Sequence, residues 1–530
     1  MNNSKIEPAV NNLVRDGKAV PYYLNDGVIR TIVLLITVLC CILTSTSYYE
    51  SFGGAEPIEY PLQGSITQYD PYVQQFDAFM KGQLHFDYEP SEDFLAIENP
   101  YDPGQRDNVY YLYDRAYFEG KYYSYFGAAP IIVYMMPYYF IHGSLPSATQ
   151  IQLVFMTLFS VFMPMLIYTI GEKLYKKLHP FMLALISYTA FISSLQLFLA
   201  RGRTPFYYIA ATSAMAFLSA FGYFFFKGVF SKNTKKACIM YGIAGLAFAL
   251  CFHSRVNVAF GAAFIVVPVV IFGIILKKRE AYVPADDEEV TFFKAYRCKD
   301  IILELCSLAS FVVIGFIIAF MYNKARFGSI LDFGSTYQLT IAEVSKYKLD
   351  VKEFGNSIFH YFLAPLREIE ETGEITFGYW KIANLDRYIY IDAHFGILSV
   401  PFALLGLLMP FIAGDKKKSV FLRTTLICAM IGCVVMGWFD YCLGGVIYRY
   451  LCDFSVIFAT VAAISAFAIA YRIQKLRSFS ARFIGNGFFV AFLIYSVYFT
   501  FKIMAIKNGN LLEMDPDSFF CRLFATYMSN

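Results

Sequence analysis

Long apolar runs alternate with short polar segments through most of the 530-residue chain. An α-helix needs about 20 mostly apolar residues to cross the hydrocarbon core of a bilayer. The first such run begins after 27 residues, so we expect a retained anchor at 28–48 behind a cytoplasmic tail, 1–27, rather than a cleaved signal peptide. Runs of sufficient length predict eleven membrane-spanning helices, at residues 28–48, 149–171, 180–200, 204–226, 237–253, 256–276, 300–321, 393–413, 420–438, 446–470 and 482–503.

The composition supports a membrane protein. Hydrophobic residues make up 57% of the chain and charged residues only 16%, against roughly 25% charged residues in a soluble domain. The formal net charge of +3 gives no argument for a nucleic-acid partner, and the partner that composition indicates is the lipid bilayer. We therefore predict an all-α polytopic membrane protein, a bundle of about eleven transmembrane helices located in the cell membrane.

The basic residues of the short connections predict the orientation, because Lys and Arg collect on the cytoplasmic side. Five connections are basic: 171–179, 227–236, 277–280, 414–419 and 471–477. All five face the cytoplasm only if the apolar segment 124–142, which contains Pro130 and Pro137, does not cross. We interpret that segment as a helix on the outer membrane surface. The N-terminus is then cytoplasmic, and the C-terminal tail, 504–530, is external.

Two long connections, 49–148 and 323–392, are external in this topology. Between residues 47 and 123 the first contains fourteen Asp or Glu residues and four Lys or Arg residues. Both connections are rich in Tyr, Phe and Gly, which favours ordered structure with juxtamembrane helices over a flexible linker. The first separates span one from span two, and the second separates spans two to seven, within 149–322, from spans eight to eleven, within 393–503.

An acidic helix is predicted just after the first span, in TQYDPYVQQFDAFMKGQLHFD (67–87). Asp70 can cap the free N–H groups of its first turn, Pro71 suits the first helical position and Gly82 suits the exit. Asp77 lies two turns beyond Asp70 on the same face. Asp70 is therefore either an ordinary cap or a carboxylate placed to act on a membrane-borne substrate, and the pattern leaves both open.

This Asp, followed by GKYYSYFGAAPIIVYMMPYYFIHG (120–143), resembles the first external loop of GT-C glycosyltransferases. The likeness is to the branch with protein O-mannosyltransferases and lipid A aminoarabinose transferases. It implies a GT-C-like bundle in which Asp70 is catalytic. The family's second acid is replaced by Pro71, so we assign no metal ligand and leave open a divalent cation near Asp70. The candidate substrate-binding residues in this region are Asp77, Lys121, Tyr122 and Tyr123.

Several cations stand at the external ends of predicted spans. Arg201 and Arg203 lie in LARGRTPFYY, and Arg255 lies in CFHSRVNVAFG. Each is either a snorkelling anchor or a ligand, and guanidinium groups bind phosphate in a bidentate manner. GLAFALCFHSR resembles the family segment in which a Lys contacts the donor phosphate, which implies that Arg255 is the first phosphate ligand. His253, two residues earlier, is a substrate-binding candidate.

Two more candidates come from the C-terminal half. Arg449, in GGVIYRYLCDF, resembles the family's Arg-Tyr-Leu-x-Pro start of a late helix, which implies a further phosphate contact. His394, in IDAHFGIL, borders the second external connection. A structural histidine is expected there more than a catalytic one, and we keep His394 as a substrate-binding candidate.

Three classes of function fit these features. The leading one is an enzyme: an inverting glycosyltransferase that moves a sugar from a polyprenyl-phosphate donor to an envelope glycan, lipid or protein acceptor outside. A transporter or flippase of lipid-linked saccharides expects ionisable residues within spans and internal repeats, whereas these spans read as nearly free of charge. A non-catalytic GT-C-like protein is the third class. The chain has no Walker, dinucleotide-binding or HExxH motif.

Overall fold

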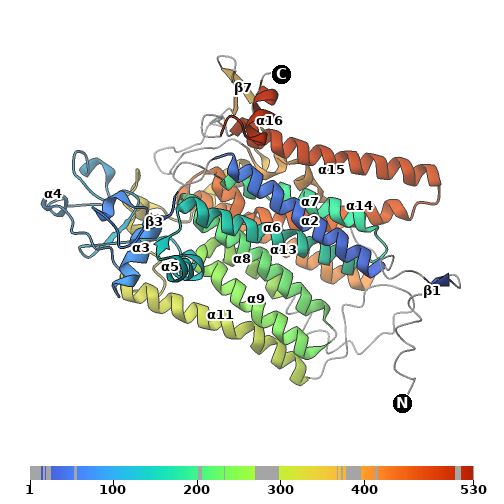
Figure 1. The fold of residues 1–530 in the computed structure, drawn as a ribbon, viewed down its shortest axis with the longest axis horizontal. Coiled ribbons are helices and arrows are strands. Elements are labelled where there is room, and N and C mark those ends of the chain that lie inside the picture. The colour runs from blue at the N-terminus through green and yellow to red at the C-terminus, as the bar shows by residue number, and fades with distance from the viewer. Residues whose placement is uncertain are drawn as a thin grey trace.

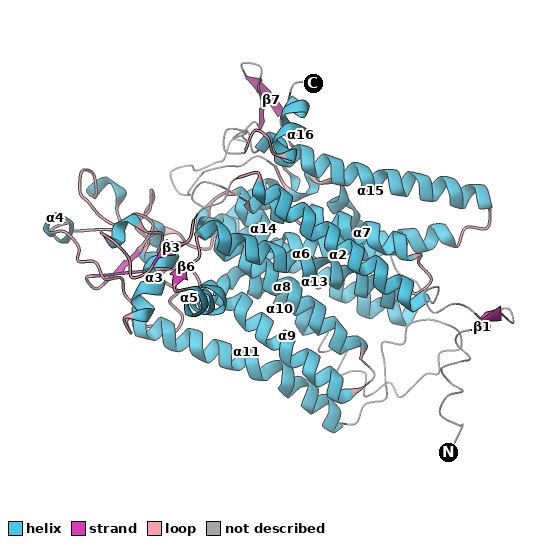
Figure 2. Cartoon of the chain, viewed as in Figure 1, coloured by secondary structure: helices cyan, strands magenta, loops and turns pink. Residues whose placement is uncertain are grey.

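The protein is a bundle of long α-helices that run side by side (Figure 1). Among the residues that the structure describes, nine helices are long and apolar enough to cross a membrane. Strands are short and lie away from the centre of the bundle (Figure 2). The chain is thus an α-helical, multi-pass membrane protein, as its apolar runs predict. The computed structural model describes residues 14–15, 18–19, 26–52, 56–200, 206–231, 233–268, 298–366, 368–371, 374–377, 395–411, 416–507 and 515–528.

The long helices match the predicted spans to within a few residues at most ends, and several, such as α2 and α15, extend beyond the predicted span. The bundle helices are α2 (Asp26–Glu50), α6 (Ala148–Leu174), α7 (Pro180–Ser193) with the 3₁₀ turn η7 (Gln196–Leu199), α8 (Phe206–Phe230), α9 (Thr234–Ser254), α10 (Val256–Pro268), α11 (Cys298–Phe327), α13 (Lys416–Gly444), α14 (Tyr448–Gln474) and α15 (Phe479–Lys507). The remaining elements outside the two long connections are β1 (Val14–Arg15), β2 (Lys18–Ala19), η15 (Ile397–Ser399), η16 (Pro401–Phe411) and α16 (Phe519–Met528).

The helices differ in how much of their surface the protein itself covers. In the most apolar stretch of α14, 89% of residues are buried inside the protein, against 11% for α2. Large apolar side chains of α2, such as Leu35 and Leu39, are more than half exposed. In a membrane protein such side chains face lipid rather than water. α14 is therefore the centre of the bundle, and α2 lies at its edge.

Two of the eleven predicted spans look different in the structure. The run 256–276 begins as α10, which is described as far as Pro268, and residues 269–276 lie outside the described part of the chain. The described part of the run 393–413, residues 395–411, forms 3₁₀ helix instead, in η15 and the eleven-residue η16. Hydropathy measures how apolar a segment is and says nothing about its backbone. Gly406 of η16 packs against the ring of Phe458 in α14, where a Cβ atom would stand 3.1 Å from the ring.

Most of the described residues of the two long connections fold together at one end of the bundle, which we call the loop end. The hairpin of β4 and β5 is joined to the second connection by a bridge from Ala116 to Gln338. Leu339 donates its N–H to the carbonyl of Arg115 at 2.9 Å and accepts the N–H of Asp114 at 2.9 Å. The short elements here are β3 (Ile58–Glu59), η4 (Ile66–Gln68), α3 (Pro71–Met80), α4 (Glu92–Leu95), η5 (Pro103–Gln105), β4 (Ala116–Phe118), β5 (Lys121–Tyr123), the π-helical η6 (Ile131–Met135), α5 (Met136–His142), β6 (Ser144–Leu145), η10 (Ser335–Tyr337), η11 (Val344–Lys346), η12 (Val351–Glu353), α12 (Phe354–Ile358) and the π-helical η13 (Phe359–Leu363). The hairpin of β7 (Glu368–Glu371) and β8 (Glu374–Phe377) lies apart from them, beside α15 and α16 (Figure 1).

The apolar segment 124–142 enters and leaves at the loop end. Tyr123, just before it, packs against Phe327 at the end of α11, with ring centroids 5.4 Å apart. Just after it, Leu145 of β6 pairs with Ile58 of β3 in an antiparallel ladder. Figure 1 shows α5 end-on, whereas the long helices run across the view. α5 therefore runs across the direction of the long helices at this end. That 124–142 does not cross the membrane stays a prediction.

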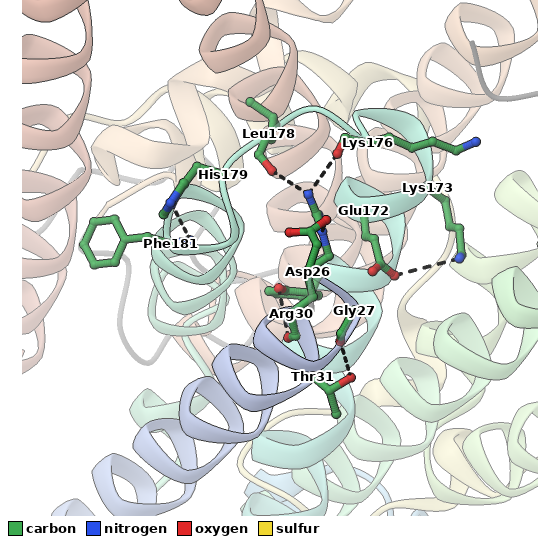
Figure 3. A network of polar contacts seen from close by, with 11 residues as sticks. Asp26, Gly27, Arg30, Thr31, Glu172, Lys173, Lys176, Leu178, His179 and Phe181 are labelled. Carbon is green, nitrogen blue, oxygen red and sulfur yellow. Dashed lines mark hydrogen bonds and ion pairs between the residues drawn. The ribbon is translucent and has the colours of Figure 1, made fainter. Parts of the chain in front are cut away.

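The opposite end of the bundle is held by Arg30, near the start of α2 (Figure 3). Its Nε donates to Asp26 at 2.9 Å, and its guanidinium donates to the carbonyls of Lys176 and Leu178 at 2.9 and 3.1 Å. These carbonyls belong to the basic turn between α6 and α7. Tyr175 of the same turn packs against Tyr471 near the end of α14, with ring centroids 5.6 Å apart. The basic connections 171–179 and 471–477 therefore share the end opposite the loops.

Candidate functional site

Asp70 caps the helix that the sequence predicts. Its Oδ1 accepts the backbone N–H groups of Tyr72 at 2.8 Å and Val73 at 3.1 Å, and its own backbone is extended. Pro71 is the first residue of α3, and Gly82 follows the helix with a φ of +72°, as expected for a residue at the exit. The cap uses only one carboxylate oxygen. Oδ2 of Asp70 is not needed to hold the helix.

Burial dominates the electrostatics of Asp70. The side chain is partly exposed, but protein surrounds it on most sides and raises the pKa of the carboxyl group above its ordinary value. The two backbone N–H groups and the nearby Arg115 favour the carboxylate and lower the pKa in part. A carboxylate with a raised pKa is a stronger base than an ordinary aspartate, so it accepts a proton more readily near neutral pH.

Arg115 and Asp114, which the sequence reading missed, lie beside this helix start. Arg115 donates to the side-chain oxygen of Gln74 at 2.7 Å and to the carbonyls of Tyr113 and Tyr69 at 2.9 and 3.3 Å. It is 8% exposed, so it is a fixed cation that holds the first turn of α3. Asp114 is also buried and accepts a hydrogen bond from the hydroxyl of Tyr207 at the start of α8. The pair links the loop that carries Asp70 to the bundle.

Arg255 stands at the junction of α9 and α10. Its Nε donates to Oδ2 of Asp453 at 2.8 Å, and the guanidinium lies 4.9 Å from the ring centroid of Tyr450. The Asp453 side chain is fully buried and that of Arg255 is 20% exposed. One edge of the guanidinium is therefore held by a buried acid from α14.

Arg449 also lies beside the ring of Tyr450. Its guanidinium is 5.6 Å from the ring centroid of Tyr450 and 5.4 Å from that of Tyr207. Arg449 and Arg255 also lie close enough to interact electrostatically. The two cations proposed as phosphate ligands thus gather at the ends of α9 and α14, next to the same aromatic ring.

Tyr72 lies near both Asp70 and Arg255. It lies in the first turn of α3, fully buried, and it interacts electrostatically with both Asp70 and Arg255. Among the described residues its hydroxyl has no hydrogen-bond partner. Its ring packs against Phe126 of the juxtamembrane segment, with centroids 5.6 Å apart. Asp70 and Arg255, 185 positions apart in the chain, therefore border one buried tyrosine.

Asp77 has contacts of a different kind. It forms an ion pair with Lys81 at 3.0 Å and accepts a hydrogen bond from the hydroxyl of Tyr60 at 3.3 Å. These contacts hold α3 together near its exit. Its role in substrate binding stays a prediction that its present contacts do not favour.

The candidates in β5 lie within the loops. Lys121 is exposed, whereas Tyr122 is fully buried among apolar residues that include Phe94. Tyr123 is 7% exposed and contacts Phe327. The buried side chains build the fold that presents Asp70, and their predicted contact with substrate remains untested.

His253 lies in the last turn of α9, next to its final residue, Ser254. Its Nε2 is 2.9 Å from the carbonyl of Gly315 in α11, a hydrogen bond between two bundle helices. Substrate binding by this histidine stays a prediction. Arg201, Arg203 and His394 lie outside the described residues.

The described residues do not offer a ready metal site. No three His, Cys, Asp or Glu side chains within the described part of the chain gather closely enough to hold an ion. Oδ1 of Asp70 already serves the helix cap, and Pro71 occupies the next position. A divalent cation near Asp70 therefore does not fit these residues well, and the chemistry derived below uses the side chains alone.

Comparison with known proteins gives a distant likeness. No protein-family model matches the chain, and no curated protein matches it either. The apo crystal structure of the oligosaccharyltransferase of Archaeoglobus fulgidus is similar, with 13% identity, a TM-score of 0.47 and coverage of 96% of this chain and 60% of that chain. The oligosaccharyltransferase AglB of the same organism, in complex with an inhibitory peptide and a dolichol-phosphate, gives 12% identity, a TM-score of 0.43 and the same coverage.

This chain spans 60% of the length of those proteins. Both TM-scores lie below 0.5, which is too low to assign a family or an activity.

Proposed function

We propose that this chain is a GT-C-like glycosyltransferase that moves a sugar from a polyprenyl-phosphate donor to an acceptor at the loop end of the bundle. The observation that carries the proposal is the meeting of Asp70 and Arg255 around Tyr72. A base from a loop helix and a cation from the ends of two bundle helices stand together at one end of a membrane bundle. That is the arrangement that transfer from a lipid-borne phosphate requires.

The reaction needs one base and one anion site. The acceptor hydroxyl loses its proton to Asp70 while its oxygen bonds to the anomeric carbon of the sugar. The bond from that carbon to the phosphate oxygen breaks, and its electron pair leaves with polyprenyl phosphate. Negative charge grows on the phosphate in the transition state, and Arg255 and Arg449 stabilise it as fixed cations in a buried setting. Attack from the face opposite the phosphate inverts the anomeric carbon.

The position of the site suits a donor held in the bilayer. Arg255 and Arg449 lie at the ends of α9 and α14, where a lipid phosphate stands in the headgroup region. The polyprenyl chain is then in lipid beside the bundle, and the acceptor approaches from the loops. The envelope glycan, lipid or protein acceptor, the cytoplasmic N-terminus and the external C-terminus are parts of this proposal.

A direct test uses purified protein in nanodiscs with a panel of polyprenyl-phosphate-linked sugars and isolated envelope material as acceptor. We expect release of polyprenyl phosphate that depends on the acceptor, with the sugar recovered on the acceptor in inverted configuration. Binding of these donors without release, for every donor and acceptor fraction, would contradict a transferase and favour a carrier or a binding protein.

A further inference from the structure

Two buried carboxyl groups lie close to Arg255, one of the two arginines proposed to bind the donor phosphate. Asp440, near the end of α13, is 2% exposed, and Asp453, in the second turn of α14, is fully buried. Asn257 of α10 donates to Oδ1 of Asp440 at 2.8 Å. Acids at this depth are costly unless they are paired, so their presence in an apolar bundle calls for a role.

The two acids face each other. Their carboxyl groups lie within hydrogen-bonding reach. Oδ2 of Asp440 and Oδ1 of Asp453 are buried, and neither accepts a hydrogen bond from a described residue. Oδ1 of Asp453 is 2.7 Å from Nε of Arg255, but the N–H of that nitrogen is directed at Oδ2. Two adjacent carboxylates repel each other in a buried site, and one proton between them removes the repulsion and fills an empty acceptor.

The groups around the pair set the net charge of the site. Arg255 and Arg449 are the cations that interact with the pair or its partners among the described residues. With one proton on the acid pair, the two arginines and the two acids together carry one net positive charge. The neutral or titratable neighbours that face the pair from the packed elements are Asn257 of α10, Cys251 of α9, Tyr450 of α14 and Tyr361 of η13.

We propose that Asp440 and Asp453 share one proton and set the cation site to a single net positive charge, so that it selects a lipid phosphodiester over a lipid diphosphate. The inference rests on the proposed function and adds a physical reason why its donor is a sugar on a polyprenyl monophosphate. A phosphodiester carries one negative charge and leaves the occupied site neutral. A diphosphate carries at least one charge more and leaves an uncompensated anion in a buried site.

Both acids are positioning residues in this account. Asp453 fixes the direction of the Arg255 guanidinium, and Asp440 holds the shared proton against Asp453. Neither touches the sugar or the acceptor.

The shared proton can be seen without any transfer reaction. A protonated carboxyl group has an infrared C=O stretch distinct from that of a carboxylate. We expect the difference spectrum of wild type minus Asp440→Asn at neutral pH to contain the protonated band, because the remaining Asp453 is ionised beside Arg255. Asp107→Asn, an exposed acid in the first loop, should show only a carboxylate band. A carboxylate band alone for Asp440→Asn would overturn the proposal, whether or not the protein is a transferase.

Lipid binding tests the consequence. The two probes are a polyprenyl-phosphate sugar and a polyprenyl diphosphate, and the readout is the ratio of their dissociation constants for protein in nanodiscs. Asp440→Asn conserves the net charge, since a neutral amide and one carboxylate replace a pair with one proton. We therefore expect that ratio to remain close to wild type. The double variant with Asp440→Asn and Asp453→Asn gains one positive charge and should shift the ratio toward the diphosphate by on the order of tenfold or more.

If both acids were ionised, Asp440→Asn would add one positive charge and shift the ratio toward the diphosphate by about half the shift of the double variant, and that result would overturn the proposal. A folded double variant with the wild-type ratio of dissociation constants would also overturn the proposal. If the double variant does not fold, the infrared comparison, which needs only the single variants, decides the question.

Discussion

Gly127 of the juxtamembrane segment lies directly against the backbone of Ser254, the last residue of α9. A Cβ atom on Gly127 would stand 2.4 Å from the Ser254 carbonyl oxygen and 2.1 Å from that of His253. No side chain fits in that space, so the contact requires glycine. Arg255 is the next residue in the chain. The loop that presents Asp70 is therefore seated on the helix end that presents Arg255.

Replacing Gly127 tests whether this contact sets the site. In Gly127→Ala the new methyl group overlaps backbone oxygens, which cannot rotate away, so the segment must move off α9 at a cost of about 1–3 kcal/mol. We expect a lower melting temperature and a loss of transfer greater than the loss of folded protein explains. Gly355→Ala in α12 is the control, because a Cβ there meets nothing within 4 Å. Equal effects of the two variants on activity would contradict the account.

Replacing Arg255 separates charge from geometry. Arg255→Ala should abolish turnover or raise the donor KM, and it leaves Asp453 buried without its cation, which costs about 3–5 kcal/mol of stability. Arg255→Lys keeps a charge but loses the planar fork, so part of the activity should remain. Donor binding and thermal unfolding are measured on both variants. Donor binding by folded Arg255→Ala that equals wild type would remove Arg255 from the phosphate site.

The loss of kcat/KM at low pH should follow the protonation of Asp70. The base must be ionised to act, and burial raises its pKa, so kcat/KM should fall as pH drops through a value above that of an ordinary aspartate. Arg115 lowers the pKa of Asp70. Arg115→Gln should therefore move the acid limb to higher pH, and Arg115→Lys should move it less. A limb in Arg115→Gln that stays in place or moves to lower pH would exclude Asp70 as the titrating base.

The orientation in the membrane is open to labelling. Asp107 lies in the first loop and Arg477 in the basic turn after α14, at opposite ends of the bundle, and both are exposed. In intact cells an impermeant thiol reagent should modify Asp107→Cys and not Arg477→Cys, compared with the background from native cysteines. The reverse pattern would place the basic connections outside and invert the proposed topology.

Much of the fold follows from the apolar pattern, because a membrane span must bury its own backbone hydrogen bonds and so must be a long helix. The run 393–413 shows a feature of the fold that the apolar pattern does not predict. It is as apolar as the others, yet η16 is a 3₁₀ helix, which rises about 2.0 Å per residue and is fixed by packing on α14 rather than by composition. Hydropathy alone does not distinguish a 3₁₀ helix such as η16 from an α-helical span.

The site was predictable where its chemistry is local. Asp70 was found because a cap, a proline and a glycine stand at fixed spacings around it. Arg115 was missed because its partners, such as Gln74, come from a distant part of the loop. Asp453 lies within the predicted span 446–470, where a charge in an apolar run is itself a signal of function, so the reading of these spans as nearly free of charge was incomplete.

The central claim is that Asp70 is a catalytic base as well as a cap, and one comparison tests it most directly. Asn caps helices about as well as Asp, so Asp70→Asn should melt close to wild type. An amide does not accept a proton usefully at neutral pH, and transfer from a polyprenyl-phosphate sugar should fall roughly 10²–10⁴-fold. Asp77→Asn, whose ion pair with Lys81 lies two turns away, should lose far less. Transfer by Asp70→Asn at the wild-type rate would contradict the account and leave Asp70 only a cap.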